Sequence, residues 1–288
     1  MQRQYHLISG LPRSGSTLLA AILRQNPRFS AGMSGPLGPI FNAMLAAMGP
    51  TNETAQFLGE EQRRRLLISL FDSIHGDVPP DRTVFDTNRI WTSLLAQLVA
   101  IAPDVKVICC VRSVAWIMDS LERLQRRNPL QPTKLFAMAE ERQTVFTRTE
   151  ALARRDRLVG FAWHALQEAY YGDLSRHLLI LEYDILSQRP RDCMQLVYRF
   201  LGEPWFEHDF GNVEYSEEQF DATLGTPGLH TVRPVVAPER RQTVLPPELF
   251  RKFAKLSFWR DATGSNASRI TVETGRSDGS DEAGVQEA

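Results

Sequence analysis

Residues that can bind an anion gather near the amino terminus, in the stretch SGLPRSGSTLL at positions 9–19. The apolar run at positions 5–8 before it predicts a buried strand, and the residues from Ser16 onward have the apolar spacing of a helix. A glycine loop that leads into a helix presents free backbone N–H groups and the positive end of the helix dipole. We therefore predict a phosphate-binding loop between this strand and this helix.

The positive charge of this loop lies at Arg13. Gly10 and Gly15 have the spacing of the first part of a Walker loop, but Ser16 stands where that motif has lysine. The Walker lysine reaches the terminal phosphates and the next hydroxyl holds magnesium, so its absence argues against an ordinary nucleoside triphosphatase. The alternative is a tight turn between strand and helix that binds nothing.

Further strand and helix patterns must position this loop. Apolar strand patterns at 83–86, 104–111 and 177–183 are each followed by a helical pattern, at 94–99, 115–127 and 193–201. Alternating strands and helices predict a parallel sheet with helices on both faces. The segment 29–39, with three glycines and two prolines, is predicted to be a loop.

The composition sets the limits of the interpretation. With 288 residues and 43% hydrophobic residues, the chain can form a large core, and we predict one domain at 1–260 and a disordered acidic tail at 261–288. A net charge of -1 does not favour nucleic acid as a partner. The three cysteines fit neither a disulfide framework nor a metal site. No signal peptide and no run of ~18 apolar residues is found, so we expect a cytoplasmic protein without a membrane partner.

A second anion site is predicted at Arg112, which follows the strand at 104–111. Ligands of doubly wound sheets bind at the carboxyl ends of the strands. Ser120 lies eight residues further on, within the next predicted helix. A guanidinium and a hydroxyl that converge on one point suit a phosphate monoester.

Taken together, these two sites resemble the two donor-binding signatures of sulfotransferases that use 3′-phosphoadenosine 5′-phosphosulfate (PAPS). The resemblance extends over residues 5–205 and implies a three-layer sandwich with a P-loop NTPase-like fold. It implies that Arg112 and Ser120 hold the 3′-phosphate. It implies that the 5′-phosphosulfate is held by Pro12, Arg13, Ser14, Gly15, Ser16, Thr17 and Leu18. The loop is similar to that of the tyrosylprotein and bacterial branches, which have arginine where the cytosolic branch has lysine.

The resemblance continues at Tyr183, whose segment Tyr-Asp-Ile-Leu is similar to the Tyr-Glu-Asp-Leu segment of the family. It implies that Tyr183 contacts the donor near the adenine. The Arg-Lys-Gly triplet that closes over the 3′-phosphate in the cytosolic branch is absent. Arg233 is our predicted substitute, with Arg240 and Arg241 as less favoured alternatives.

The resemblance implies transfer of a sulfuryl group from PAPS to a hydroxyl or amine of a small-molecule or peptide acceptor, without a metal. Family branches place a catalytic glutamate or histidine at or after the strand that here ends in Asp86, so Asp86 is predicted to be the general base, with a supporting or helix-capping role as the alternative. Arg89 is predicted to contact the sulfuryl group or to pair with Asp86. His230 is the rival base, because it shares a loop with Arg233.

Two other functions stay open at this point. A nucleotide-dependent phosphotransferase would use the strand that ends in Asp86 to hold magnesium. A non-catalytic nucleotide-binding module would keep the phosphate loop without a base. The acceptor, the choice between O- and N-sulfation and the oligomeric state have no readable signal in the sequence.

Overall fold

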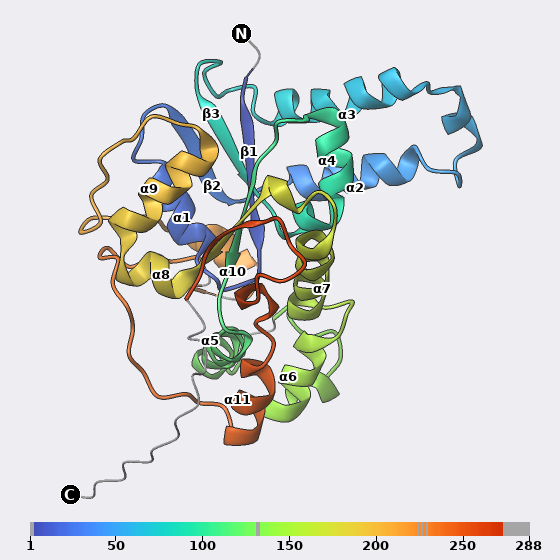
Figure 1. Ribbon diagram of the computed structural model, residues 1–288. Helices are drawn as coiled ribbons and strands as arrows, with labels where there is room; N and C mark the ends of the chain where they lie inside the picture. Colours follow the sequence, from blue (N-terminus) through green and yellow to red (C-terminus); the bar gives the residue numbers. More distant parts are fainter. Residues whose placement is uncertain (1–2, 131–132, 224, 226, 229, 273–288) are drawn as a thin grey trace, which may run out of the picture.

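A six-stranded parallel sheet forms the centre of the protein (Figure 1). The computed structural model describes residues 3–130, 133–223, 225, 227–228 and 230–272. The strand order is β2-β3-β1-β4-β5-β6, and every pair of neighbours runs parallel. The strands are β1 (Tyr5–Gly10), β2 (Phe29–Ser34), β3 (Thr83–Thr87), β4 (Val107–Val111), β5 (Leu178–Glu182) and β6 (Ser268–Ile270). Because β1 lies between β3 and β4, its carboxyl end is a topological switch point, where such sheets bind ligands.

Helices cover both faces of this sheet, as the alternating pattern predicts. One apolar cluster lies between the sheet and α1 (Ser16–Leu23), α8 (Tyr183–Gln188) and α9 (Pro190–Leu201). The larger cluster lies on the other face. It is formed with α2 (Leu37–Ala47), α3 (Glu60–Ile74), α4 (Leu95–Ile101), α5 (Val114–Arg127), α6 (Val145–Ala153), α7 (Leu158–Tyr171) and α11 (Pro247–Ala254). The central strands β1, β3, β4 and β5 are buried almost throughout, which explains the largely apolar sequences of β1, β4 and β5. The predicted fold class is confirmed.

Short helices complete the connections. They are η1 (Glu53–Phe57), η2 (Arg89–Leu94), η3 (Glu140–Arg142), η4 (Ser175–His177), η5 (Phe258–Arg260) and α10 (Glu218–Thr223). No helix among the described residues is long and apolar enough to cross a membrane.

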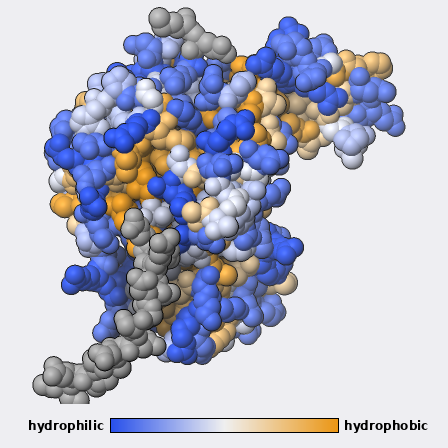
Figure 2. Space-filling model, viewed as in Figure 1, coloured by the Kyte–Doolittle hydropathy of each residue, from blue (hydrophilic) through white to orange (hydrophobic). Residues whose placement is uncertain are grey.

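The segment from α2 to α3 projects from the body of the protein as an arm (Figure 1). Arg63 holds its far turn, because its guanidinium donates to the carbonyl oxygens of Met48 at 2.6 Å, Ala55 at 2.7 Å and Leu58 at 3.0 Å. Figure 2 shows apolar residues exposed on this arm among hydrophilic ones, and Phe57 near its tip is 79% exposed. Arg63 therefore stabilises a turn that the sequence pattern alone did not show.

Two sequence predictions about this fold were wrong. The segment 29–39 is not a loop, since it contains β2 and the start of α2. β2 consists mostly of small residues, so it has no apolar pattern, and its pairing with β3 stabilises it. The predicted tail begins too early, because β6 pairs with β5 and buries Ile270. Residues 273–288 of that tail lie outside the described residues.

Candidate active site

The loop between β1 and α1 has a backbone that its glycines make possible. Gly10 has a φ of +103°, and a Cβ there would lie 2.2 Å from the carbonyl oxygen of Cys110 on β4. Gly15, with a φ of +93°, precedes the first turn of α1. The Ser14 hydroxyl donates to the carbonyl oxygens of Leu11 and Cys110, the latter at 2.8 Å. The loop is therefore fixed to β4 and leads directly into the amino terminus of α1.

Arg13 connects the two predicted anion sites. Its Nε donates to the Ser120 hydroxyl on α5 at 3.1 Å, across 107 residues of sequence. Its backbone has a φ of 57°, which is uncommon for a residue with a side chain. Burial and the nearby charge of Arg112 lower the pKa of Arg13 to about 10. Arg13 is thus still protonated at neutral pH, and its side chain reaches from the loop to Ser120.

Tyr183, the first residue of α8, covers the loop. A Cβ on Gly15 would lie 2.7 Å from Cδ2 of the tyrosine, so only glycine allows this approach. The guanidinium carbon of Arg112 lies 4.4 Å from the centre of the same ring. An arginine over an aromatic ring is a stabilising cation–π contact. The structure therefore brings together the loop, Tyr183 and Arg112, which the sequence had linked only through the resemblance.

Arg112 itself is suited to an anion. Its Nε is buried and has no hydrogen-bond partner within the part of the chain that the structure describes. Burial lowers its pKa, and the charge of Arg241 lowers it further, while Tyr183 has the opposite effect. A buried donor without a partner costs free energy, and an anionic ligand would remove that cost.

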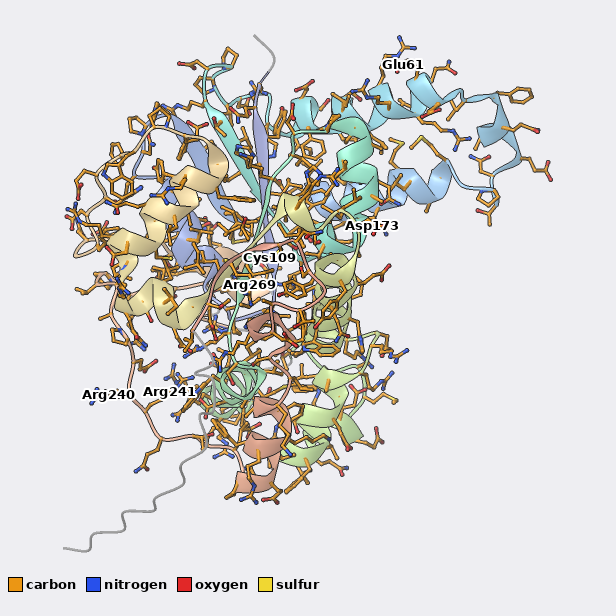
Figure 3. The ribbon with its side chains drawn as sticks, viewed as in Figure 1. Glu61, Cys109, Asp173, Arg240, Arg241 and Arg269 are labelled. Carbon is orange, nitrogen blue, oxygen red and sulfur yellow. The ribbon has the colours of Figure 1, made fainter. Side chains whose placement is uncertain are left out.

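Arg241 is the arginine from the carboxyl-terminal segment that lies among these groups. Its Nη2 is 2.9 Å from Asp119 on α5, and its guanidinium carbon lies 5.5 Å from the ring centre of Trp116. Figure 3 shows Arg240 and Arg241 beside α5. Arg233, our first choice from the sequence, is 64% exposed and pairs with Glu239 at 2.6 Å. Its donor contact stays a prediction, and Arg241 is better placed.

Arg89 begins η2, next to the loop. Its carbonyl oxygen accepts the Ser9 hydroxyl at 3.2 Å, and burial lowers the pKa of its guanidinium. No ion pair to Arg89 is found within the described ranges, and Asp86 has other partners. The predicted ion pair between Arg89 and Asp86 is therefore absent from the described residues. The predicted contact of Arg89 with a sulfuryl group stays a prediction.

Asp86 is 4% exposed and lies on β3 opposite Leu7 of β1. Leu7 precedes the end of β1 at Gly10, where the loop begins. Its two carboxylate oxygens accept from Trp91 Nε1 at 2.9 Å and from His75 Nε2 at 3.1 Å. The cap of η2 is Asn88, so the capping role weighed for Asp86 is wrong. Its role as base stays a prediction, and its contacts fit the supporting role.

His230, the rival base, is paired with Asp221 of α10. The backbone N–H of His230 donates to Asp221 Oδ2 at 2.8 Å, and the ring Nδ1 lies 2.5 Å from Oδ1. The negative charge of Asp221 raises the pKa of Arg13, against the larger effects of burial and Arg112. Asp221 was missed from the sequence because only the fold brings it to the loop.

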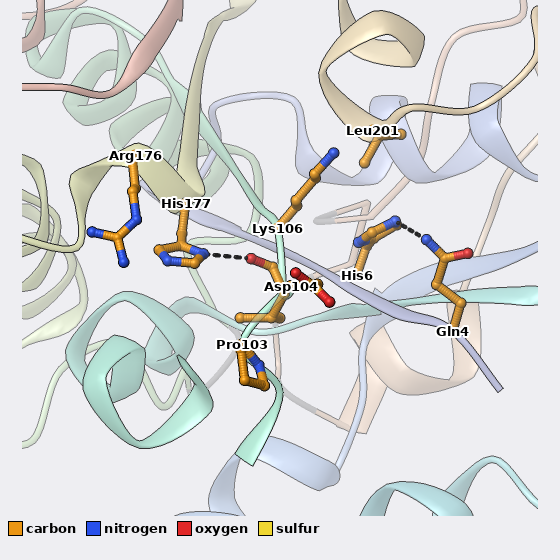
Figure 4. Close-up of a pocket in the computed structure, with 9 residues that line it drawn as sticks. Gln4, His6, Pro103, Asp104, Lys106, Arg176, His177 and Leu201 are labelled. Carbon is orange, nitrogen blue, oxygen red and sulfur yellow. Dashed lines mark hydrogen bonds between the residues drawn. The ribbon is translucent and has the colours of Figure 1, made fainter. Parts of the chain in front are cut away.

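A separate cavity of about 440 Å³ lies at the opposite end of the strands (Figure 4). Gln4, His6, Lys106 and His177 are among its lining residues. Burial and the charge of Lys106 lower the pKa of His6 to about 4, so this ring is neutral.

Within the described residues no group of three or more histidine, cysteine or acidic side chains could hold a metal ion. The three cysteines are free and buried, as expected for small core residues.

The loop, its switch-point position and the arginines around it define a P-loop-like α/β protein with a site suited to a phosphorylated ligand. The family model described as "Sulfotransferase family" matches residues 7–207. The chain belongs to the sulfotransferase family, a class of transferases.

Three known proteins show how the chain relates to this family. It is 28% identical over 230 residues to nodulation protein NoeE of Sinorhizobium fredii (strain NBRC 101917 / NGR234), covering 72% of this chain and 52% of NoeE. The chain thus spans about half the length of that relative. The sulfotransferase domain of the Synechococcus PCC 7002 olefin synthase is 18% identical, with a TM-score of 0.51 over 91% of this chain and 97% of that one. Mouse sulfotransferase SULT7A1, solved in complex with 3′,5′-adenosine bisphosphate (PAP), is 15% identical. Its TM-score is 0.47, over 90% of this chain and 85% of that one.

Proposed function

We propose that this protein transfers a sulfuryl group from PAPS to a hydroxyl or amine of a small-molecule or peptide acceptor. The observation that carries the proposal is the hydrogen bond from Arg13 to Ser120, beside the buried Nε of Arg112, which has no hydrogen-bond partner among the described residues. It joins a loop suited to a phosphosulfate with a second anion site. PAPS carries anionic groups at both its 3′ and 5′ positions, whereas ATP has no 3′-phosphate.

The 5′-phosphosulfate is assigned to the loop. The backbone N–H groups of residues 13–18 are at the amino terminus of α1, where the helix dipole adds about half a positive charge. Arg13 supplies the side-chain charge, and Arg89 is the second cation for the sulfuryl oxygens. The Ser14 hydroxyl is engaged with β4, so Ser14 contributes through its N–H group.

The 3′-phosphate is assigned to Arg112 and Ser120, with Arg241 as the additional cation. Three buried or half-buried arginines lie together here: burial and the charges of Arg112 and Arg241 lower the pKa of Arg13, and burial and the charge of Arg241 lower the pKa of Arg112. Such a cluster is costly without a ligand and favours one with several negative charges. Tyr183 is assigned to the adenine.

The reaction needs charge stabilisation more than covalent chemistry. The acceptor atom forms a bond to sulfur while the bond from sulfur to the phosphate oxygen breaks, and the electron pair leaves with the phosphate. Arg13 and the amino terminus of α1 are aimed at that leaving charge, and such preorganised groups are the main source of catalysis in comparable sites. The proton of the acceptor must pass to a base.

Calorimetry tests the donor assignment. We expect 3′,5′-adenosine bisphosphate (PAP) to bind more tightly than 5′-AMP or Mg-ATP, and Arg112→Ala to weaken PAP about 10–100-fold while changing AMP little. Arg127→Ala is the matched control, because Arg127 is an exposed arginine at the end of α5, the helix that follows Arg112. Equal affinity for PAP and AMP would overturn the assignment, and tight magnesium-dependent ATP binding would favour a phosphotransferase.

A further inference from the structure

The segment from Val213 to Val236 folds back on itself beside the donor loop. Val213 N–H donates to Pro234 O at 2.7 Å, and Val232 N–H donates to Tyr215 O at 3.1 Å. The Tyr215 hydroxyl accepts the backbone N–H of Met33 on β2 at 2.7 Å. The base of this segment is therefore fixed to β2, and α10 and His230 lie between its two ends.

Asp221 and His230 form a tight pair within this segment. Both carboxylate oxygens bind the same residue, one at its backbone N–H and one at its ring Nδ1. The side chains are 1% and 13% exposed. An ionised carboxylate only accepts hydrogen bonds, so Nδ1 carries the hydrogen and Nε2 carries the lone pair. This is the arrangement by which a carboxylate orients a histidine that accepts a proton.

The location of the pair agrees with a role in transfer. The Tyr215 hydroxyl accepts the N–H of Met33 near the carboxyl end of β2, so this segment lies at the sheet edge where the loop begins. The negative charge of Asp221 acts on Arg13 there, as do the positive charges of Arg112 and Arg241. Arg13 is the residue assigned to the phosphosulfate. The pair is therefore close enough to the loop for the charge of Asp221 to act on Arg13.

We propose that His230 is the general base of sulfuryl transfer and that Asp221 positions it. The inference rests on the proposed function. His230 Nε2 takes the proton of the acceptor as the bond from the acceptor atom to sulfur forms and the bond from sulfur to the phosphate oxygen breaks. PAP leaves with the electron pair of the broken bond. Asp221 stabilises the imidazolium, which then releases the proton to solvent.

Turnover is tested with radiolabelled PAPS and a series of substituted phenols of different acidity. We expect His230→Gln to lower kcat about 10²–10⁴-fold, with the affinity for PAP unchanged. The loss should be largest for the least acidic phenol, because an acidic phenol needs less help in losing its proton. A merely structural role would lower kcat equally for all phenols or weaken PAP. His164→Gln is the control, since His164 lies on α7 and contacts Trp163.

A second measurement needs no acceptor. With ¹⁵N-labelled histidine, nuclear magnetic resonance should show the Nδ1–H form of His230, a change of its ring signals when PAP is added, and a different tautomer balance in Asp221→Asn. His230 ring signals that do not change when PAP binds, or an unchanged kcat in His230→Gln, would overturn the inference.

The two proposals fail in different ways. If the wild-type protein does not bind PAP, the proposed function is wrong. If PAP binds normally and His230 does not respond to it, only the role of His230 and Asp221 is wrong. If none of the phenols is an acceptor, the resonance measurement still decides.

Discussion

Two histidine–carboxylate pairs of the same composition lie in different parts of this protein. His75 and Asp86 pair between α3 and β3, with Trp91 as a third partner of the carboxylate. His230 and Asp221 pair beside the donor loop, where the carboxylate acts on the charge of Arg13. The first pair joins elements of the core and the second faces the arginines of the candidate site. The groups around each histidine–carboxylate pair therefore indicate whether the pair supports the core or can take part in the reaction.

Turnover should separate the two pairs by the largest margin. We expect Asp221→Asn to lower kcat by about 10²-fold or more, because the orientation and the tautomer of His230 are lost. His75→Gln should keep a kcat near that of the wild type. Radiolabelled PAPS and phenols provide the measurement. A larger loss in His75→Gln than in Asp221→Asn would reverse the comparison and return the role of base to Asp86.

Two buried histidines with neutral side-chain hydrogen-bond partners provide a third case. His6 and His208 contact the neutral side chains of Gln4 and Tyr198. Burial lowers the pKa of each to about 4, with Lys106 adding to the effect at His6. The unfolded chain has a pKa of about 6.5, so the stability that these neutral rings provide is complete above that pH and is lost as the pH falls towards 4.

This pH dependence can be measured by urea denaturation. We expect the free energy of unfolding to fall by up to about 1.4 kcal/mol per pH unit for each histidine between pH 6.5 and 4. His6→Gln should make the slope shallower. An unchanged slope in that variant would show that His6 does not titrate in this range.

The free energy of unfolding should depend more on Asp86 than on Asp221, which is the opposite of the order expected for turnover. Asp86→Asn leaves the His75 contact poorly satisfied in the core, so we expect the free energy of unfolding to fall by about 1–3 kcal/mol. Asp221 lies in α10, none of whose described side chains belongs to the two apolar clusters, so Asp221→Asn should cost less. Urea denaturation of both variants checks the ranking, and equal losses would mean that Asp221 also supports the core.

The smallest effect is expected at Arg233. It forms an exposed ion pair with Glu239, and such pairs contribute about 0–1 kcal/mol. Arg233→Ala should therefore change PAP affinity only a few-fold, whereas Arg241→Ala should weaken it more. Calorimetry with PAP compares the two. A dominant effect of Arg233 would restore the choice made from the sequence.

Most of the fold was predictable because its central strands are buried on both faces. Continuous apolar runs at β1, β4 and β5, each followed by a helical pattern, allowed few other arrangements. The edge strands β2 and β6 were missed. β2 is made largely of small residues and β6 is only three residues long, so their stability comes from strand pairing and not from a local pattern.

The sequence by itself determined the glycine loop between β1 and α1, because glycine spacing, a helix start and Arg13 are all local. It also singled out Arg112 and Ser120 through their place after a strand. The tertiary structure decided which distant groups share a site: Arg13 with Ser120, Tyr183 with Gly15, and His230 with Asp221. Such contacts join segments that are far apart in the chain or lie on irregular loops. Residue types at such positions do not reveal which charges will face each other, since only the packed fold sets those distances.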